Sequence, residues 1–504
     1  MSDEAYDLAD LHERAEDTRV VVIGAGIGGL VAAREIAKLG IGVTLVDAAD
    51  APGGAIRSAR VAGLTLDLGA ESFATRGGHV ERLLADLGLA DDVVSPGTGA
   101  GGAWVAGVPG VGAAPLPVGG ILGIPANPFA DDVRRVLGWR GVWRAYLDRI
   151  RPVLTIGHAR SLGELVGSRM GAKVRDRLVA PVTTGVYSAT ADDIDPDIAA
   201  PGLNAAVTRA GSLSGGVAAL VADRQVAPGG AVRGLRGGMG RLVTALVDDI
   251  VELGGEVRSG VRALAIERAE ATEPEDPEPI DDAEQSPRAW RVTLADEDAL
   301  AADAVIVATE EAPARRLLAP VADGLAADPP APGPAVAIVT LVVRSDALDA
   351  APRGTGVLTV PGSHRAKALT HTTAKWQWVA DEAGAGVHAV RVSFGSADGP
   401  PATDGVSAAD AATLALAEAS ALLGVDLDRT ALIASRVERF AQSQPASTIG
   451  QAERTRSARA AIRSAPTIGA VGAWLAGTGL AQVVPDAIAE ADRIRRAVLF
   501  PESD

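Results

Sequence analysis

The sequence contains no cysteine among its 504 residues. This absence excludes disulfide bonds, thiolate metal ligands, a cysteine nucleophile and a flavin attached through a cysteine thioether. A chain without cysteine suits a reducing compartment. Residues 1–17 are acidic and lack an apolar run, so they do not resemble a signal peptide. We therefore expect a cytoplasmic protein.

Basic residues are outnumbered, and lysine is scarce among them. The chain has 64 acidic and 47 basic residues and a net charge of −17, and only Lys38, Lys173, Lys367 and Lys375 are lysine. Nucleic acid and anionic lipid repel such a chain on average, so we expect no nucleic-acid partner. Two long uncharged stretches, 93–130 and 464–485, are interrupted by Gly and Pro. We therefore expect no transmembrane segment.

The pattern of apolar residues predicts several elements of secondary structure. Hydrophobic residues make up 47% of the chain, which is enough for a large packed core. The expected elements are a strand at Arg19–Ile23, a helix at Ile27–Leu39, a strand at Ile41–Val46, a helical region at 134–177, strands at Val261–Ile266, Trp290–Leu294 and Ala304–Ala308, and a last helix with Pro485 in its first turn. The first three form a parallel βαβ unit. The acidic, proline-rich segment 269–288 reads as a solvated insertion that lengthens a hairpin.

A glycine-rich turn lies between the first strand and the first helix. Gly24-Ala25-Gly26-Ile27-Gly28-Gly29 fits the spacing G-x-G-x-x-G, in which the glycines allow a tight turn, close approach of a pyrophosphate and close helix packing. Asp47 ends the second strand, where a carboxylate accepts hydrogen bonds from ribose hydroxyls. Gly24, Gly26, Ile27, Gly28, Gly29 and Asp47 are therefore predicted to bind a dinucleotide.

Three further segments favour FAD over NAD as the bound dinucleotide. Gly53 and Gly54 follow the second strand and offer backbone without side chains, and Gly69-Ala70-Glu71-Ser72 forms a turn after a strand-like stretch. The last predicted helix follows Gly477-Thr478 and the residues Gly479, Leu480, Ala481 and Gln482. The start of this helix would stabilise an anionic reduced flavin. Together with the first glycine motif, these segments predict non-covalent FAD bound by both ends of the chain.

The sequence resembles the protoporphyrinogen/coproporphyrinogen oxidases, which are monoamine-oxidase-like flavoproteins. The resemblance runs from about Arg19 to Phe500. It includes Leu116-Pro117 with Gly123-Ile124-Pro125, the block Pro181-Val182-Thr183-Thr184-Gly185-Val186-Tyr187, the block Gly234-Leu235-Arg236-Gly237-Gly238-Met239-Gly240-Arg241-Leu242, and Lys375-Trp376. It implies an α/β fold in which a Rossmann-like FAD-binding domain is interleaved with a mixed-sheet substrate domain and a helical subdomain. It also implies that the backbone of Val261 lies against the adenine.

The resemblance divides the chain into interleaved parts. The FAD-binding domain is expected at 18–92, 226–311 (with 269–288 as an acidic loop) and 464–500, the substrate domain at 93–118 and 312–450, and the helical subdomain at 119–210. Three features depart from the family. Ala55 replaces a basic residue after the double glycine, a familiar aromatic run appears as Phe440…Pro445-Ala446-Ser447…Gly450-Gln451, and the stretch before Trp104 lacks an arginine found in some relatives.

The activity that the resemblance implies is FAD-dependent oxidation of coproporphyrinogen III to coproporphyrin III in haem biosynthesis, with O2 as acceptor and H2O2 as product. The flavin carries this chemistry, so no catalytic side chain is expected, and the six histidines show no metal-ligand spacing. Arg76 is the predicted substrate contact, because guanidinium groups suit carboxylates. The expected partners are the porphyrinogen, O2 and a ferrochelatase that receives the product.

Other functions fit the same motifs. Protoporphyrinogen IX is the alternative substrate within the family. An amine oxidase usually flanks its substrate with aromatic side chains, whereas this chain has 7 Trp, 3 Tyr and 5 Phe, and a carotenoid desaturase needs an apolar entrance. A non-catalytic binding protein of the same fold, like the prenyl-protein escort factors, is the alternative outside enzymes. Bound flavin in the purified protein argues against that last class.

Overall fold

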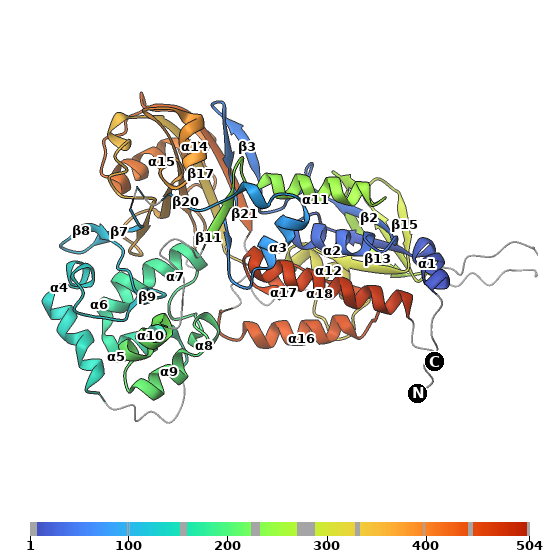
Figure 1. Ribbon diagram of the computed structural model, residues 1–504, viewed down its shortest axis with the longest axis horizontal. Coiled ribbons are helices and arrows are strands. Elements are labelled where there is room, and N and C mark those ends of the chain that lie inside the picture. Colours follow the sequence, from blue (N-terminus) through green and yellow to red (C-terminus); the bar gives the residue numbers. More distant parts are fainter. Residues whose placement is uncertain are drawn as a thin grey trace, which may run out of the picture.

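A computed structural model describes residues 8–97, 99, 101–151, 159–222, 232–269, 288–327, 333–396, 399–441 and 447–500. Residues 226–231 and 270–287 and the pair Pro445 and Ala446, which were considered above, lie outside the described residues. The chain builds three lobes: one around a parallel sheet, one around a seven-stranded sheet and one made of helices (Figure 1). The α/β fold class predicted from the sequence is confirmed.

The parallel sheet forms because its strands are covered on both faces. Val20 and Val22 of the first strand pack into one core with several helices, whereas Val21 and Ile23 pack into a second core on the opposite face. The strand order is β12 (Glu256–Ser259), β2 (Gly42–Asp47), β1 (Arg19–Ile23), β16 (Ala304–Val307), β22 (Ile468–Ala470). One face carries α2 (Ile27–Ala37), α3 (His79–Asp86), α11 (Gly240–Glu252) and α18 (Leu480–Leu499), and the other carries β13 (Ala263–Arg268), β14 (Trp290–Leu294), β15 (Ala299–Ala302), α12 (Glu311–Leu318) and α16 (Gln451–Arg463). The predicted parallel βαβ unit is confirmed.

The last helix begins earlier than its sequence predicts. α18 starts at Leu480, directly after Gly479, whose φ of 113° is a conformation that side-chain-bearing residues rarely adopt. Leu480, Ala481 and Gln482 therefore form the first turn instead of preceding the helix. Pro485 lies inside the helix, so its assignment to the first turn was wrong. Ile488, Ala491, Ile494 and Val498 form an apolar stripe along α18 that packs into the core shared with α2.

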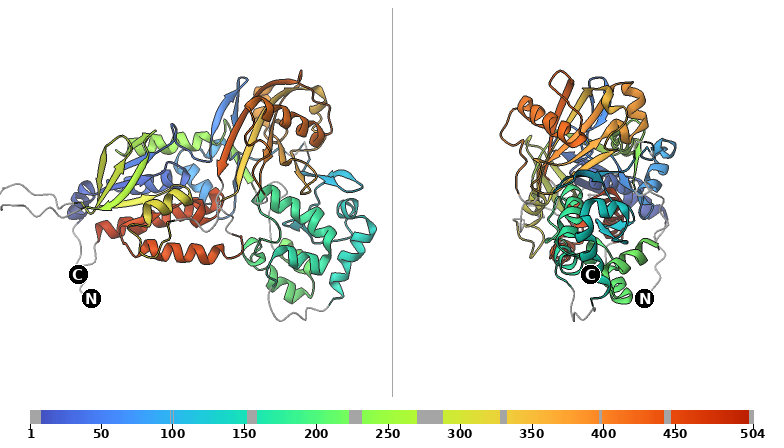
Figure 2. Two further views of the ribbon diagram at one scale, coloured as in Figure 1. Left: turned by 180° about the vertical axis from the view of Figure 1, so that it is seen from behind. Right: turned by 90° about the vertical axis from the view of Figure 1, so that its left-hand side faces the viewer.

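The seven-stranded sheet is covered on both faces. Its order is β21 (Leu432–Ala441), β17 (Ala335–Arg344), β20 (Val387–Phe394), β19 (Ala366–His371), β18 (Gly356–Thr359), β7 (Trp104–Val108), β8 (Gly112–Pro115). α15 (Ala408–Leu423) covers the outer face and forms an apolar core with it. The inner face meets the hairpin of β3 (Ser58–Val61) and β4 (Leu64–Asp67), α13 (Thr372–Lys375) and α14 (Gln377–Ala383). This inner face is directed toward the parallel-sheet lobe (Figure 2).

The helical lobe confirms the helical region predicted at 134–177. It contains α4 (Asp131–Tyr146), α5 (Leu162–Met170), α6 (Ala172–Val174), α7 (Ala180–Tyr187), α8 (Pro196–Ala199), α9 (Leu203–Ala210) and α10 (Leu213–Ala222), with short strands β9 (Gly120–Ile121) and β10 (Ile124–Pro125). Among the described residues, no single helix is both long and apolar enough to cross a membrane. The bent pair α9 and α10, whose axes differ by 115°, meets the length and composition requirement together.

Short elements complete the chain. A small sheet joins β5 (Phe73–Ala74), β11 (Val232–Leu235) and β6 (Val93–Val94) between the lobes, and α1 (Leu8–Asp17) and α17 (Ala473–Ala476) are short helices. The chain crosses between the lobes several times, so each lobe except the helical one is built from separate stretches of sequence (Figure 1). Residues from both ends of the chain are thereby placed in the same lobe.

The strands on either side of the acidic segment form the predicted antiparallel hairpin. Arg268 pairs with Trp290, and the amide of Ala269 donates to the carbonyl of Ala289 at 3.0 Å. We predict that replacing 270–287 by Asn-Gly, which leaves a three-residue loop ending at Arg288, keeps the hairpin closed. The melting temperature and the flavin content should stay within the error of the wild type. A fall of more than about 5 °C, measured by calorimetry, would show that the segment contributes to the fold.

Candidate functional site

The glycine turn after β1 has the tight geometry that its sequence predicts. The amide of Gly24 donates to the carbonyl of Val46 at 2.7 Å, which closes the turn against β2. A Cβ atom at Gly29 would lie 1.9 Å from the carbonyl oxygen of Gly24. Only glycine therefore allows α2 to begin this close to the strand. The turn places the first amides of α2 at the carboxyl end of the sheet.

Two helix N-termini meet beside this turn. Glycine is the N-cap residue of both α2 (Gly26) and α18 (Gly479), and the first turn of each helix contains no acidic residue. A Cβ atom at either glycine would lie more than 4 Å from every other described atom. At Gly28 a Cβ atom would lie 3.3 Å from Val483 of α18. The starts of the two helices thus lie side by side, each with free space at its N-cap glycine, and the helix dipoles favour negative charge there.

The two other predicted glycine segments extend the same surface. The amide of Gly53 donates to the carbonyl of Ala25 at 2.8 Å, and a Cβ atom at Gly54 would lie 3.2 Å from the Cα atom of Gly26. At Gly69 a Cβ atom would lie 2.0 Å from the carbonyl oxygen of Ala55, so this position also requires glycine. We call the surface formed by Gly24–Gly29, Gly53–Gly54, Gly69–Ser72 and Gly479–Gln482 the glycine cradle.

Asp47 and Val261 lie at one end of the cradle. The carboxylate of Asp47 accepts hydrogen bonds from the amides of Ala25 and Ala49, at 2.5 and 2.7 Å. The amide of Val261 donates to the carbonyl of Asp47 at 2.8 Å. Asp47 therefore holds the glycine turn in place through its own side chain, and each carboxylate oxygen keeps a second lone pair for a ribose hydroxyl. The adenine role of Val261 and the ribose role of Asp47 stay predictions.

The cradle fits a dinucleotide on its own geometry. It offers amides at two helix N-termini, space that a Cβ atom at Gly26 would occupy, and a carboxylate beside the turn. A pyrophosphate needs the amides and the open space, and a ribose needs the carboxylate. The structure thus brings together predicted segments from both ends of the chain: Gly28 and Val483, which directly follows Gly479–Gln482, are 455 positions apart in the sequence.

The side chain of Glu71 forms two ion pairs with side chains of the seven-stranded-sheet lobe. Its carboxylate accepts hydrogen bonds from Lys375 Nζ at 2.5 Å and from Arg391 at 2.6 Å, and Arg391 also donates to the carbonyl of Gly69. Burial raises the pKa of Glu71, but the two cations outweigh burial and lower it to about 2. Glu71 is therefore ionised, and it links the cradle to the seven-stranded sheet.

Sequence reasoning missed the roles of Asp67 and Arg391. The carboxylate of Asp67 accepts hydrogen bonds from the amide of Met239 at 2.9 Å and from the hydroxyl of Ser58 at 2.5 Å. The first of these bonds joins β4 to the start of α11. Arg391 stands alone as a charge in the apolar run of β20 and is buried. A single charge inside such a run was the available signal, since buried charges are nearly always paired.

The predicted substrate contact is not part of the cradle. Arg76 follows β5 in an exposed turn before α3. A different cation is buried: Lys367 on β19 donates to the hydroxyl of Ser188 at 2.5 Å and forms no ion pair with a described residue. Burial lowers the pKa of Lys367 to about 8. Substrate binding by Arg76 stays a prediction, and Lys367 is a second basic side chain at the boundary with the helical lobe.

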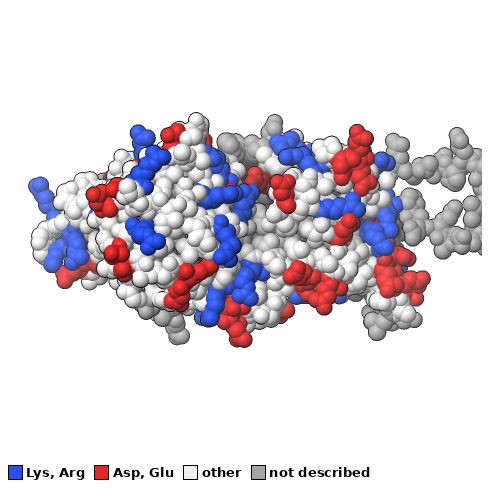
Figure 3. Space-filling view, turned by 90° about the horizontal axis from the view of Figure 1, so that it is seen from above, with Lys and Arg blue, Asp and Glu red and all other residues white. Residues whose placement is uncertain are grey.

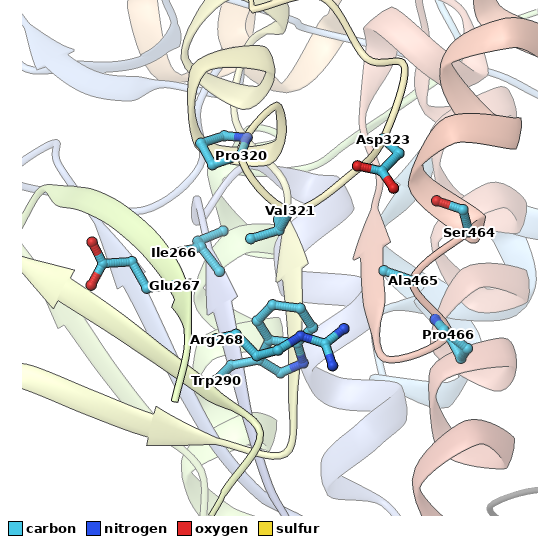
Figure 4. Close-up of a pocket in the computed structure, with 10 residues that line it drawn as sticks. All are labelled: Ile266, Glu267, Arg268, Trp290, Pro320, Val321, Asp323, Ser464, Ala465 and Pro466. Carbon is cyan, nitrogen blue, oxygen red and sulfur yellow. The ribbon is translucent and has the colours of Figure 1, made fainter. Parts of the chain in front are cut away.

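Two cavities lie apart from the cradle. One, of about 470 Å³, is lined by ten residues of β13, β14 and neighbouring loops, with Arg268 stacked on Trp290 (Figure 4). The other, of about 200 Å³, is lined by Leu116, Pro117, Val118, Gly120, Gly123, Ile124, Pro125, Leu178 and Val182. Neither contains a residue predicted to bind FAD. The second contains residues of the family blocks named above, namely Leu116-Pro117, Gly123-Ile124-Pro125 and Val182.

Comparisons with known proteins agree with this geometry. The family described as flavin containing amine oxidoreductase matches residues 27–499. The chain is 30% identical over 491 residues to coproporphyrinogen III oxidase of Mycobacterium tuberculosis (strain ATCC 25618 / H37Rv), covering 95% of this chain and 96% of that protein. It is 28% identical over 523 residues to coproporphyrinogen III oxidase of Propionibacterium freudenreichii, covering 96% and 92%.

The comparison with solved structures shows a shared fold. A crystal structure from Exiguobacterium sp. 255-15, provisionally assigned as a protoporphyrinogen oxidase, superposes with a TM-score of 0.77 at 22% identity. The superposition covers 96% of this chain and 99% of that one, so the whole fold is shared. The match of the family over 27–499 includes most of the glycine cradle and every strand of the two large sheets except β1. The chain therefore belongs to the flavin-containing amine oxidoreductase family.

Proposed function

We propose that this chain oxidises coproporphyrinogen III to coproporphyrin III with FAD as cofactor and O2 as electron acceptor, in the cytoplasmic synthesis of haem. The observation that carries the proposal is the similarity over 95% of the chain to a protein named coproporphyrinogen III oxidase. The glycine cradle supports it, because it supplies a flavin site. The reaction removes six electrons in three two-electron steps and converts three O2 to three H2O2. Product transfer to a ferrochelatase is part of the same proposal.

We assign a part of FAD to each segment of the cradle. The amides at the start of α2, from Gly26 to Gly29, would hold the pyrophosphate, and Asp47 and Val261 would hold the ribose and the adenine. Gly69–Ser72 and the start of α18 at Gly479–Gln482 would border the flavin ring. FAD, when bound, supplies the chemistry by accepting a hydride from a substrate carbon and passing two electrons to an acceptor.

The groups around the cradle would position the substrate and stabilise charge on the flavin. None of their side chains is proposed as a nucleophile or an obligatory base. The amides at the start of α18 place partial positive charge where the reduced flavin is anionic. Aromatisation of the macrocycle drives the overall six-electron oxidation, so orientation of the macrocycle is the main requirement. Arg76 is proposed to bind a substrate carboxylate. Lys367 is a further candidate, since this buried ammonium has no anionic partner among the described residues.

Protoporphyrinogen IX is the second candidate substrate, and one observation favours it. The helical lobe exposes Trp139, Trp143 and Ile150, whose exposed fractions are 57%, 55% and 71%. Exposed tryptophan and isoleucine side chains on a helical surface favour contact with lipid. A lipid-associated enzyme would have better access to the more apolar protoporphyrinogen. The net charge of −17 opposes such contact with an anionic membrane, so the soluble substrate remains the proposal.

We predict that Gly26→Val abolishes FAD binding without unfolding the protein. The φ of Gly26 is −68°, which any residue adopts, and a side chain there meets no described atom within 4 Å. The valine would instead fill the space proposed for the pyrophosphate. The purified variant should be colourless, with the melting temperature of wild-type apoprotein. Gly102→Val, at an exposed position with similar free space, is the matched control and should keep its flavin. Normal flavin content in Gly26→Val would refute the proposed pyrophosphate site.

We predict that the flavin is held without a covalent bond. The chain has no cysteine, so it offers no thiol for attachment of the flavin. Precipitation with trichloroacetic acid should therefore release all of the yellow chromophore into the supernatant as FAD. The ratio of released flavin to protein gives the occupancy. Flavin that remains with the pellet after washing would contradict the prediction.

We predict that coproporphyrinogen III has the higher kcat/KM in detergent-free buffer. It carries four carboxylates, which the arginine-rich basic residues of this chain can bind, and it needs no lipid phase. Both porphyrinogens should be assayed at several ionic strengths, because screening weakens carboxylate contacts and should lower kcat/KM for coproporphyrinogen more. A higher kcat/KM for protoporphyrinogen, or activity that requires added lipid, would favour the second candidate.

A further inference from the structure

Three charged side chains are gathered between the cradle and the seven-stranded sheet. The exposed fraction of the side chain is 10% for Glu71, 18% for Lys375 and 7% for Arg391. The carboxylate of Glu71 lies between the two cations, with contacts of 2.5 and 2.6 Å. These side chains come from the cradle itself, from α13 and from β20, so the cluster forms only when the two lobes are assembled.

The cluster carries more positive than negative charge. One carboxylate faces two cations, and Arg391 Nε has no hydrogen-bond partner among the described residues although it is buried. Asp67 is the next acid, but its carboxylate is engaged by Met239 and Ser58. Burial raises the pKa of Asp67. Among the described residues, Glu71 is the one carboxylate that pairs with both cations, so the cluster holds two positive charges on one carboxylate in a region of low dielectric constant, where their field is weakly screened.

This charge lies next to the segment that borders the proposed flavin ring. Glu71 is a cradle residue, and the guanidinium of Arg391 contacts the carbonyl of Gly69. The following amide, Ala70, donates to the carbonyl of Ala55 at 2.9 Å, beside Gly53 and Gly54. The cluster therefore directly contacts the segment Gly69–Ser72, which is one of the four segments of the cradle.

We infer that Glu71 is a positioning residue that holds Lys375 and Arg391 against the cradle, and that their excess charge raises the reduction potential of FAD. The inference rests on the placement of the flavin proposed above. Two-electron reduction of a flavin produces an anionic ring when its N1 is not protonated. A nearby positive charge stabilises this reduced form more than the neutral oxidised form, and the carboxylate of Glu71 limits that effect.

The test is the midpoint potential of the purified holoenzyme, measured by equilibration with a reference dye in the absence of any porphyrinogen. Lys375→Met should weaken the binding of reduced FAD relative to oxidised FAD about tenfold, which lowers the potential by about 30 mV. Glu71→Gln should strengthen the binding of reduced FAD relative to oxidised FAD about tenfold and so raise the potential. The double variant has the net charge of the wild type and should have a potential close to it. Lys38→Met, in an exposed ion pair with Glu35 at the end of α2, is the control and should change nothing.

A second variant separates charge from geometry. Arg391→Lys keeps the positive charge but loses the guanidinium fork, so the potential should stay at the wild-type value while the melting temperature falls. If Lys375→Met retains too little flavin to measure, Lys375→Gln removes the same charge with a hydrogen-bonding side chain and should shift the potential in the same direction.

Two results would overturn the inference. One is a lower melting temperature in all cluster variants with potentials equal to the wild type, which would make the cluster a structural clamp only. The other is an equal shift in Arg391→Lys and Lys375→Met, which would show that geometry and not charge is responsible. Because no porphyrinogen is used, a wrong substrate assignment leaves these potentials unaffected, and the substrate assay can fail or succeed independently.

Discussion

The ion pairs of Glu71 determine how the two sheet lobes meet. They join residues separated by 304 positions for Lys375 and 320 positions for Arg391. Transferring three charges from water to this site is costly unless each one is paired at short range. Removing one partner of such a buried pair costs about 3–5 kcal/mol in proteins where it has been measured. The inner face of the seven-stranded sheet and the loop Gly69–Ser72 are therefore held in one relative position.

Strand register then decides which side chains share that inner face. Thr340 of β17 lies opposite Arg391, and Ile338 lies opposite both Ser393 and Glu438. Residues directly opposite each other project to the same side of a sheet, so these rows face the cradle together with Arg391. Glu438 pairs with Arg57, which follows the double glycine, at 3.1 Å. Basic side chains gather near this boundary between the lobes on the surface seen from above (Figure 3).

The features that the sequence predicts well are local ones. The turn Gly24–Gly29, its flanking strands and α2 depend on spacing within thirty residues, and the hairpin of β13 and β14 depends on two adjacent apolar patterns. The partners of Glu71 could not be predicted, because they depend on the register of β20 and on where α13 packs. The start of α18 was misplaced since Pro485 is a typical first-turn residue, whereas a positive φ at Gly479 ends the preceding loop. Long-range packing and backbone conformation at glycine leave little signal in one sequence.

Two buried or half-buried cations lie next to the cradle, in a chain whose net charge is negative. At physiological ionic strength, exposed charges more than about 8 Å away are largely screened, so most of the −17 charge contributes little inside the cradle. The amides of α2 and α18 and the pair Lys375 and Arg391 lie at or directly behind its surface. Arg391 is buried and so its field is screened far less. An acidic surface and a site suited to an anionic cofactor are therefore compatible in this fold, because distance and burial, not net charge, set the potential that a bound group experiences.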